Sequence, residues 1–239
     1  MEKVKFLRSG DSAITVEFSR TISEDVNRKI RFLEQNIAKY GIAGITDTIP
    51  AFCSITVCFN PLLIKRKALE KKISKILAAY SPSESTTKRI FQIPVCYCDE
   101  YAEDMADVCK LTGLTKEEVI EIHTSKDYLI YMLGFLPGFA YLGGMDERIE
   151  APRLETPRTL IPAGAVGIGG KQTGIYPLAS PGGWRLIGRT PITVYDADRK
   201  EPILYKAGDY IRFYPISAEE YEKISNDPSY QVEIKEEKI

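Results

Sequence analysis

The sequence predicts an α+β fold in which a small domain of strands and helices precedes a β-barrel domain. Two observations support this prediction. Residues 4–80 show strand and helix signals in the order β-β-α-β-β-α, which is typical of a small sheet with both helices on one face. Residues 128–191 contain more than half of the chain's glycines and prolines, and short apolar runs alternate there with Gly-Pro turns. This alternation is typical of a closed or nearly closed all-β unit.

The first domain is expected to span residues 1–85. Its first two strands flank the turn at Gly10 and Asp11, and Ser23 is expected to cap the helix that follows. Residues 45–60 predict two more strands, and a second helix, rich in lysine, is expected from about 62 to 80. We interpret its lysines as a solvated face, with an electrostatic docking patch as the alternative. The apolar residues that recur at helical spacing in the first helix are Val26, Ile30, Leu33 and Ile37.

A polar stretch separates the two domains. Residues 81–88, SPSESTTK, contain a proline and are expected to form a linker, so the second domain is expected to span residues 89–239. This domain opens with a strand and two helical segments, the second of which has the capping-box spacing of Thr115 and Glu118.

The chain is expected to close with three strands, a short helix and a charged tail. The three predicted strands lie at residues 192–197, 202–207 and 210–216, and they are separated by Lys-Glu-Pro and Ala-Gly-Asp turns. With the glycine- and proline-rich region, they would complete the barrel.

Composition excludes several classes of function. The formal net charge of −1 gives no electrostatic footprint for nucleic acid or for an anionic membrane. The sequence has no apolar run of the length that a membrane span needs, about 18 residues, and its first residues do not resemble a signal peptide. We therefore expect a cytoplasmic protein with reduced thiols. Cys96, Cys98 and Cys109 lack a matching second pair, so no metal is assigned.

A glycine-rich segment at residues 164–173 resembles a phosphate-binding loop only superficially. A Walker A motif ending at Lys171 would need glycine at Ala165 and serine or threonine at Gln172. No helix signal follows that could direct its N-terminus at a phosphate. We interpret the segment as tight turns between barrel strands.

His123 is the only histidine of the chain, and it ends a helical segment just before the glycine-rich region. One interpretation is that this histidine has a purely structural role, either at a helix end or in the core. The functional interpretation is a proton carrier or a hydrogen-bond donor to a substrate carbonyl.

Other candidate site residues lie beside glycine or proline in the predicted loops. Aromatic side chains fixed in this way can form the walls of a site for a flat ligand, although they could instead cap the barrel. Gln172 and Thr173 could bind an amide or a carboxylate, or satisfy the backbone of the turn. The sequence shows neither a nucleophile elbow nor paired carboxylates, so the chain looks like part of an active site. The aromatic candidates are Phe135, Phe139, Tyr176 and Trp184.

Two long motifs carry a family resemblance. The segments IHTSKDYLIYMLGFLPGFAYLGGM and IPAGAVGIGGKQTGIYPLASPGGWRLIGRTP resemble the family of 5-oxoprolinase B subunits (PxpB or KipI), whose carboxyltransferase-type domain is also called allophanate hydrolase subunit 1. LRSGDSAITVEF and IPAFCSITVCF near the N-terminus resemble it too, so the resemblance covers nearly the whole chain. It implies a cyclophilin-like β-barrel as the second domain.

The resemblance also implies an activity, partners and site residues. Members of the family hydrolyse 5-oxo-L-proline to L-glutamate with ATP as co-substrate, together with a KipA-like C subunit (PxpC) and an A subunit (PxpA-like). We therefore expect a non-autonomous 5-oxoprolinase subunit. The alternative is a KipI-type inhibitor of a sporulation sensor histidine kinase, antagonised by a KipA-like partner. A prolyl isomerase would rest on fold analogy alone.

His123 occupies the position of a family motif residue, and we assign it as the catalytic candidate. We expect it to line one cleft with Gln172, Tyr176 and Trp184, where hydrogen-bonding groups and rings would hold the lactam. The residues assigned to substrate binding are Phe135, Pro137, Phe139, Gln172, Thr173, Tyr176 and Trp184.

Overall fold

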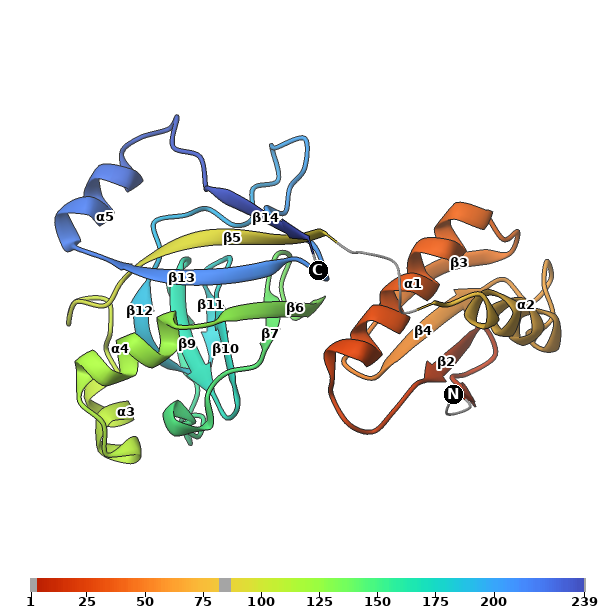
Figure 1. Ribbon diagram of the computed structural model, residues 1–239, viewed down its shortest axis with the longest axis horizontal. Helices are drawn as coiled ribbons and strands as arrows, with labels where there is room; N and C mark the ends of the chain where they lie inside the picture. The colour runs from red at the N-terminus through yellow and green to blue at the C-terminus, as the bar shows by residue number, and fades with distance from the viewer. Residues whose placement is uncertain (1–3, 82–86, 239) are drawn as a thin grey trace. The chain divides into compact units, whose positions relative to one another are not determined.

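The computed structural model describes residues 4–81 and 87–238 (Figure 1). Its internal contacts divide the chain into two compact units, Met1–Ser85 and Thr86–Ile239. Most of the predicted linker, residues 82–86, lies outside the described residues. Thr87 and Lys88, which we assigned to the linker, belong instead to the first strand of the second unit, because they pair there with the C-terminal strand.

The first unit is an antiparallel sheet with two helices in the predicted order. The strands lie in the order β1-β2-β4-β3. Helices α1 (Glu24–Tyr40) and α2 (Arg66–Ala78) bury their apolar faces with the sheet in one core. The strands are β1 (Lys5–Arg8), β2 (Ala13–Glu17), β3 (Ile45–Pro50) and β4 (Ser54–Phe59).

Helix α1 begins where the sequence predicts, and a glycine ends it. The side chain of Ser23 accepts a hydrogen bond from the backbone nitrogen of Val26, and Gly41 ends the helix in the left-handed conformation with φ of 52°. Ile30 and Leu33 are fully buried against the sheet, and burying side chains of this size stabilises a fold by about 1.5–3 kcal/mol each.

The second unit is a mixed sheet that curls into a nearly closed barrel, which confirms the predicted fold class (Figure 1). Its strand order is β10-β9-β12-β5-β13-β6-β7, and β7 lies against β10, which brings the two ends of the sheet together. The strands are β5 (Thr87–Cys96), β6 (Asp127–Leu133), β7 (Ala140–Gly143), β9 (Ala165–Gly169), β10 (Gln172–Ile175), β12 (Arg185–Arg189) and β13 (Tyr210–Ile216).

Smaller elements surround this barrel. Strands β8 (Arg158–Ile161) and β11 (Ser180–Gly182) form a separate pair. Thr115 and Glu118 form the predicted capping box at the start of α4. The helices are α3 (Met105–Thr112), α4 (Lys116–Thr124), α5 (Ala218–Ser225) and the 3-10 helix η1 (Glu147–Ile149).

The C-terminal part of the prediction needs two corrections. The segments predicted as strands at 192–197 and 202–207 form a single bridge between Tyr195 and Ile203 rather than a ladder. The segment predicted as a charged tail contains a strand, β14 (Ile234–Lys238), which pairs with β5. Strand β12 pairs with β5 only at Cys96, the last residue of β5. The first half of β5 therefore has an edge that β12 leaves open, and β14 covers this edge.

No helix among the described residues is long and apolar enough to span a membrane.

Candidate functional site

His123 lies in the core of the barrel unit, near the end of α4, with no exposed surface. Its Nδ1 is 2.8 Å from the hydroxyl oxygen of Tyr97, and its Nε2 is 2.8 Å from Oγ1 of Thr173. The imidazole stacks on the ring of Phe213 at 4.7 Å between centroids, and the hydroxyl of Tyr128 donates to the carbonyl oxygen of His123 at 2.8 Å. Every polar atom of this histidine ring therefore has a partner within the protein.

Burial determines the charge of this histidine. Loss of hydration lowers the pKa of His123 to about 3, and burial raises the pKa of Tyr97 well above its usual value. A neutral imidazole has one donor and one acceptor nitrogen, so one of the two hydroxyls accepts its hydrogen bond and the other donates. The chain Tyr97–His123–Thr173 is therefore neutral at physiological pH, and it joins the residue that follows β5 to α4 and β10. Its geometry suits a structural hydrogen-bond chain that holds these elements together better than a proton carrier in contact with solvent.

Strand β10 separates His123 from the other candidates. Side chains alternate along a strand, so Thr173 points towards His123 while Gln172 and Gly174 face the other side. A Cβ on Gly174 would lie 3.2 Å from the indole of Trp184, which places the tryptophan on that other side. The structure thus brings Thr173 to His123, and it brings Gln172 to the side of Trp184. The sequence-based expectation of one cleft shared by His123 and Gln172 does not match this arrangement.

Three of the candidate aromatic residues form a buried cluster. The ring centroids of Phe139 and Trp184 lie 5.5 Å apart, those of Phe139 and Tyr176 lie 5.6 Å apart, and both pairs pack edge to face. All three side chains are buried. These rings are positioned to support a surface from below rather than to cover a ligand themselves.

Phe135 stands out from this cluster towards solvent. Its side chain is 61% exposed, and its ring packs edge-on against Phe139 at 5.5 Å. The backbone φ of Phe135 is 61°, and the amide of Leu136 donates to the carbonyl of Gly134 at 2.6 Å. A three-residue turn with positive φ is a strained conformation for a residue with a side chain, and such strain is concentrated at functional sites. The exposed Pro137 follows directly.

Several polar groups near the cluster were missed at the level of sequence. The guanidinium of Arg153 lies 5.8 Å from the centroid of the Trp184 ring, and the Ser180 hydroxyl is buried without a hydrogen-bond partner among the described residues. Arg158 makes a two-pronged ion pair with Asp104, at 2.8 and 2.9 Å. In the sequence, the two arginines of the proline-containing stretch APRLETPR could have indicated a site that recognises a carboxylate.

The glycine-rich segment is a hairpin, as interpreted from the sequence. Strands β9 and β10 pair antiparallel, and Gly170 at φ of 64° turns between them. In the parts of the chain that the structure describes, no group of three or more His, Cys, Asp or Glu side chains could hold a metal ion.

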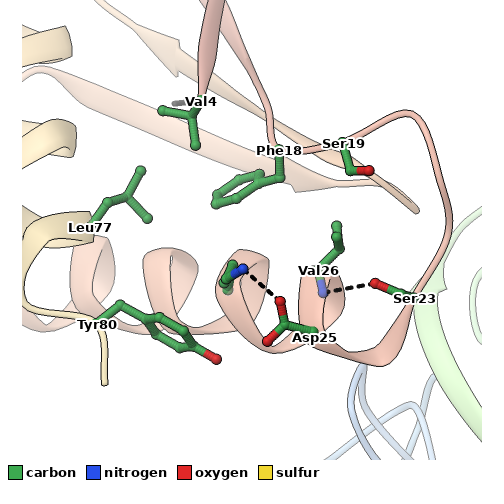
Figure 2. A pocket seen from close by; sticks show the side chains of 9 residues that line it. Val4, Phe18, Ser19, Ser23, Asp25, Val26, Leu77 and Tyr80 are labelled. Carbon is green, nitrogen blue, oxygen red and sulfur yellow. Dashed lines mark hydrogen bonds and ion pairs between the residues drawn. The ribbon is translucent and has the colours of Figure 1, made fainter. Parts of the chain in front are cut away.

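A further hollow lies in the first unit, between the first turns of α1 and the end of α2 (Figure 2). It has a volume of about 250 Å³, and Phe18, Leu77 and Tyr80 line it. Its two charged lining residues, Asp25 and Lys29, pair with each other at 2.5 Å. Because these charges neutralise one another, the hollow shows no preference for an ionic ligand.

Comparison with known proteins gives a consistent result. Residues 4–205 match the family of the carboxyltransferase domain, subdomain C and D. The chain is 40% identical to the 5-oxoprolinase B subunit of Bacillus subtilis (strain 168), over 89% of this chain and 92% of that protein. It is 38% identical to the 5-oxoprolinase B subunit of Escherichia coli O157:H7, over 90% of this chain and 97% of that protein.

A solved structure of a longer protein, TTHA0988, has the same fold. It superposes with a TM-score of 0.77 and 33% sequence identity, over 86% of this chain. The match covers 40% of that protein, so this chain spans about two fifths of its length. The match to residues 4–205, together with about 40% identity over most of two B subunits, shows that the chain belongs to the carboxyltransferase subdomain C and D family, alongside the 5-oxoprolinase B subunits.

Proposed function

We propose that the chain is a non-autonomous subunit of an ATP-dependent 5-oxoprolinase, which converts 5-oxo-L-proline to L-glutamate. The observation that carries this proposal is the 40% identity to the Bacillus subtilis B subunit over 92% of that protein. The partners we propose are an A subunit and a KipA-like C subunit.

The chemistry of the reaction explains why one chain would not suffice. The lactam of 5-oxoproline is a poor electrophile because its nitrogen donates electron density to the carbonyl. Transfer of the γ-phosphoryl group of ATP to the lactam oxygen would release ADP and make the ring carbon electrophilic. Water would add to that carbon, the C–N bond would break to give γ-glutamyl phosphate, and a second water would hydrolyse this acyl phosphate to glutamate and inorganic phosphate. Such transfer needs phosphate-binding elements and bound metal ions. The glycine-rich hairpin and the buried His123 supply neither, so we assign these steps to the partner subunits.

The side of β10 that faces Trp184 is the proposed contribution of this chain to the site. Phe135, Pro137 and Gln172 are at least partly exposed there and would contact the lactam. Arg153 would bind the substrate carboxylate. The buried rings would hold these groups in place. The buried rings are Phe139, Tyr176 and Trp184.

Reconstitution tests this proposal directly. We expect the purified chain to show no 5-oxoproline-dependent ATP hydrolysis, and we expect ADP and glutamate to form in equal amounts once the A and C subunits are added. Robust turnover by the isolated chain would contradict non-autonomy. The regulatory function would be favoured instead if the reconstituted complex showed no turnover and the chain inhibited autophosphorylation of a sensor histidine kinase.

Matched variants separate contact from support. Phe135→Ala and Gln172→Ala are expected to lower kcat/KM of the complex at least about tenfold, or roughly 1.4 kcal/mol, without changing the melting temperature. His123→Ala is expected to lower the melting temperature and to spare turnover per folded molecule. Leu111→Ala, which shortens an exposed side chain on α3, is the control for Phe135→Ala. Full activity of both contact variants would refute the assigned surface.

A further inference from the structure

The first unit carries an open groove that the proposed reaction does not use. It lies between the C-terminal end of α1 and the outer face of α2 and has a volume of about 470 Å³. Ile42 and Ile76 contribute apolar surface to it, and the side chain of Tyr40, 60% exposed, forms one wall. Lys72 and Lys75 line the opposite side. The groove therefore combines an apolar surface with ammonium groups.

The positive charge at this groove is not compensated within the described part of the unit. Helix α2 carries five cationic side chains and one anionic side chain, Glu70, which pairs with Arg66 at 3.5 Å. Lys5 and Lys29 of the same unit also have carboxylate partners, at 3.7 and 2.5 Å. Among the described residues, no carboxylate lies within 4.0 Å of Lys72 or Lys75. The cationic residues of α2 are Arg66, Lys67, Lys71, Lys72 and Lys75.

The spacing of the two lysines limits what could bind them. Residues three apart on a helix lie on the same face, with about 5–6 Å between their Cβ atoms. Two carboxylates one turn apart on another helix have the same spacing, and an apolar side chain between them would enter the groove beside Ile76. The exposed ring of Tyr40 offers an aromatic contact of the kind that is enriched at protein interfaces.

We propose that this groove docks an acidic amphipathic helix of a partner subunit. The proposal rests on the proposed function only for the source of the helix, which would be the A or the C subunit. The contact forms between ammonium and carboxylate groups at the rim and between apolar side chains within the groove. Opposite charges at an interface increase the association rate and make binding sensitive to salt.

A charge-reversal pair tests the groove in the full-length chain. Lys72→Glu/Lys75→Glu is the test variant, and Lys67→Glu/Lys71→Glu is the control, since it makes the same charge change on the same helix outside the groove lining. Binding of each variant to the purified A and C subunits is measured at low and moderate salt. We expect the test variant to bind at least about tenfold more weakly and to lose most of its salt dependence, and the control to change less than about threefold. Tyr40→Ala is expected to weaken binding without altering the salt dependence.

Each of the following binding outcomes overturns the proposal. Equal weakening by both double variants would show a general effect of charge, and wild-type binding by the test variant would show a solvated face. Absence of binding by the wild-type chain would exclude these subunits as the partner. ATP binding that depends on Lys72 and Lys75 would make the groove a site for a small anion, and self-association that depends on them would make it a contact between copies. Wild-type binding without turnover would refute the oxoprolinase function and leave the docking result standing.

Discussion

At the scale of single residues, the one histidine of the chain acts as a buried, neutral strut between Tyr97 and Thr173. Removing its side chain would leave both hydroxyls without partners in the core, and each unpaired buried group costs about 1–3 kcal/mol. A histidine held in this way stabilises the fold only in its uncharged form. Its contribution therefore depends on pH.

The pH dependence of stability is predicted to report on His123. Its pKa is about 3 in the folded state, against about 6.5 in an unfolded chain. Between these values the unfolded state binds the proton and the folded state does not, so the stabilisation is complete above about pH 6.5 and is lost as the pH falls towards 3. We expect the free energy of unfolding to fall by about 1.4 kcal/mol from about pH 7.5 to about pH 5.5 through this group.

Urea unfolding followed by the fluorescence of Trp184 measures this effect. His123 is the only histidine in the sequence, so a His123→Gln variant is expected to lose this part of the pH dependence. Parallel pH profiles for the wild type and the variant would contradict the assignment.

Several residues that the sequence singled out lie together in the structure, but their surroundings differ from the expectation. Phe135, Phe139 and Trp184 were singled out because they lie beside glycine or proline, and the structure places them in one aromatic group. The sequence left burial of His123 open as one interpretation but could not decide it, because its two partners lie 26 and 50 residues away and only the closed barrel brings them together. The shared cleft failed for a local reason, since neighbouring residues of a strand face opposite ways.

At the scale of elements, local sequence signals predicted where helices begin, but they did not predict which strands pair with one another. Ser23 and the Thr115–Glu118 pair marked helix starts because a cap is a contact within one turn. Strand β14 escaped prediction, since its charged residues resemble a tail and it exists only because β5 has an uncovered edge. The two false strands near Tyr195 had suitable residues but no continuous partner.

Strand β9 packs so tightly against Trp184 that one added methyl group, at Gly169, is predicted to destabilise the fold. A Cβ on Gly169 would lie 2.4 Å from Nε1 of Trp184, closer than real side-chain contacts allow, so the indole must shift. Overpacking of this kind typically costs about 1–3 kcal/mol. We expect Gly169→Ala to lower the melting temperature and to change the emission of the single tryptophan. Gly134→Ala is the control, since its Cβ would meet Tyr141 at an ordinary 3.5 Å. An unchanged emission spectrum would contradict this packing.

At the scale of the whole molecule, the two compact units are each proposed to fold alone. Each has its own hydrophobic core, and the second keeps its contacts if the chain is cut before β5. Because β5 begins at Thr87, a fragment that contains the whole second unit should begin at residue 87 rather than at residue 89. Thr87 and Lys88 pair with β14, and Nζ of Lys88 lies 2.5 Å from a carboxylate oxygen of Asp127.

Two fragments test this proposal. We expect residues 87–239 to give a stable β-rich domain by circular dichroism with a cooperative thermal transition. Residues 89–239 are expected to melt at a lower temperature, because they lack the Lys88–Asp127 ion pair and two pairs of the β14 ladder. A fragment 87–239 that stays unfolded would show that the second unit depends on the first.

The parallel pairing of β5 with β13 has a consequence for synthesis in the cell. Ile90 pairs with Tyr210, and β5 lies between strands that are all made later. At about 5–20 residues per second, a ribosome needs roughly 6–24 seconds to make the intervening chain. During that time the apolar residues of β5 have left the exit tunnel without a partner, while the first unit is already complete. We therefore expect the barrel half, rather than the first unit, to be the part of this chain that chaperones bind during its synthesis.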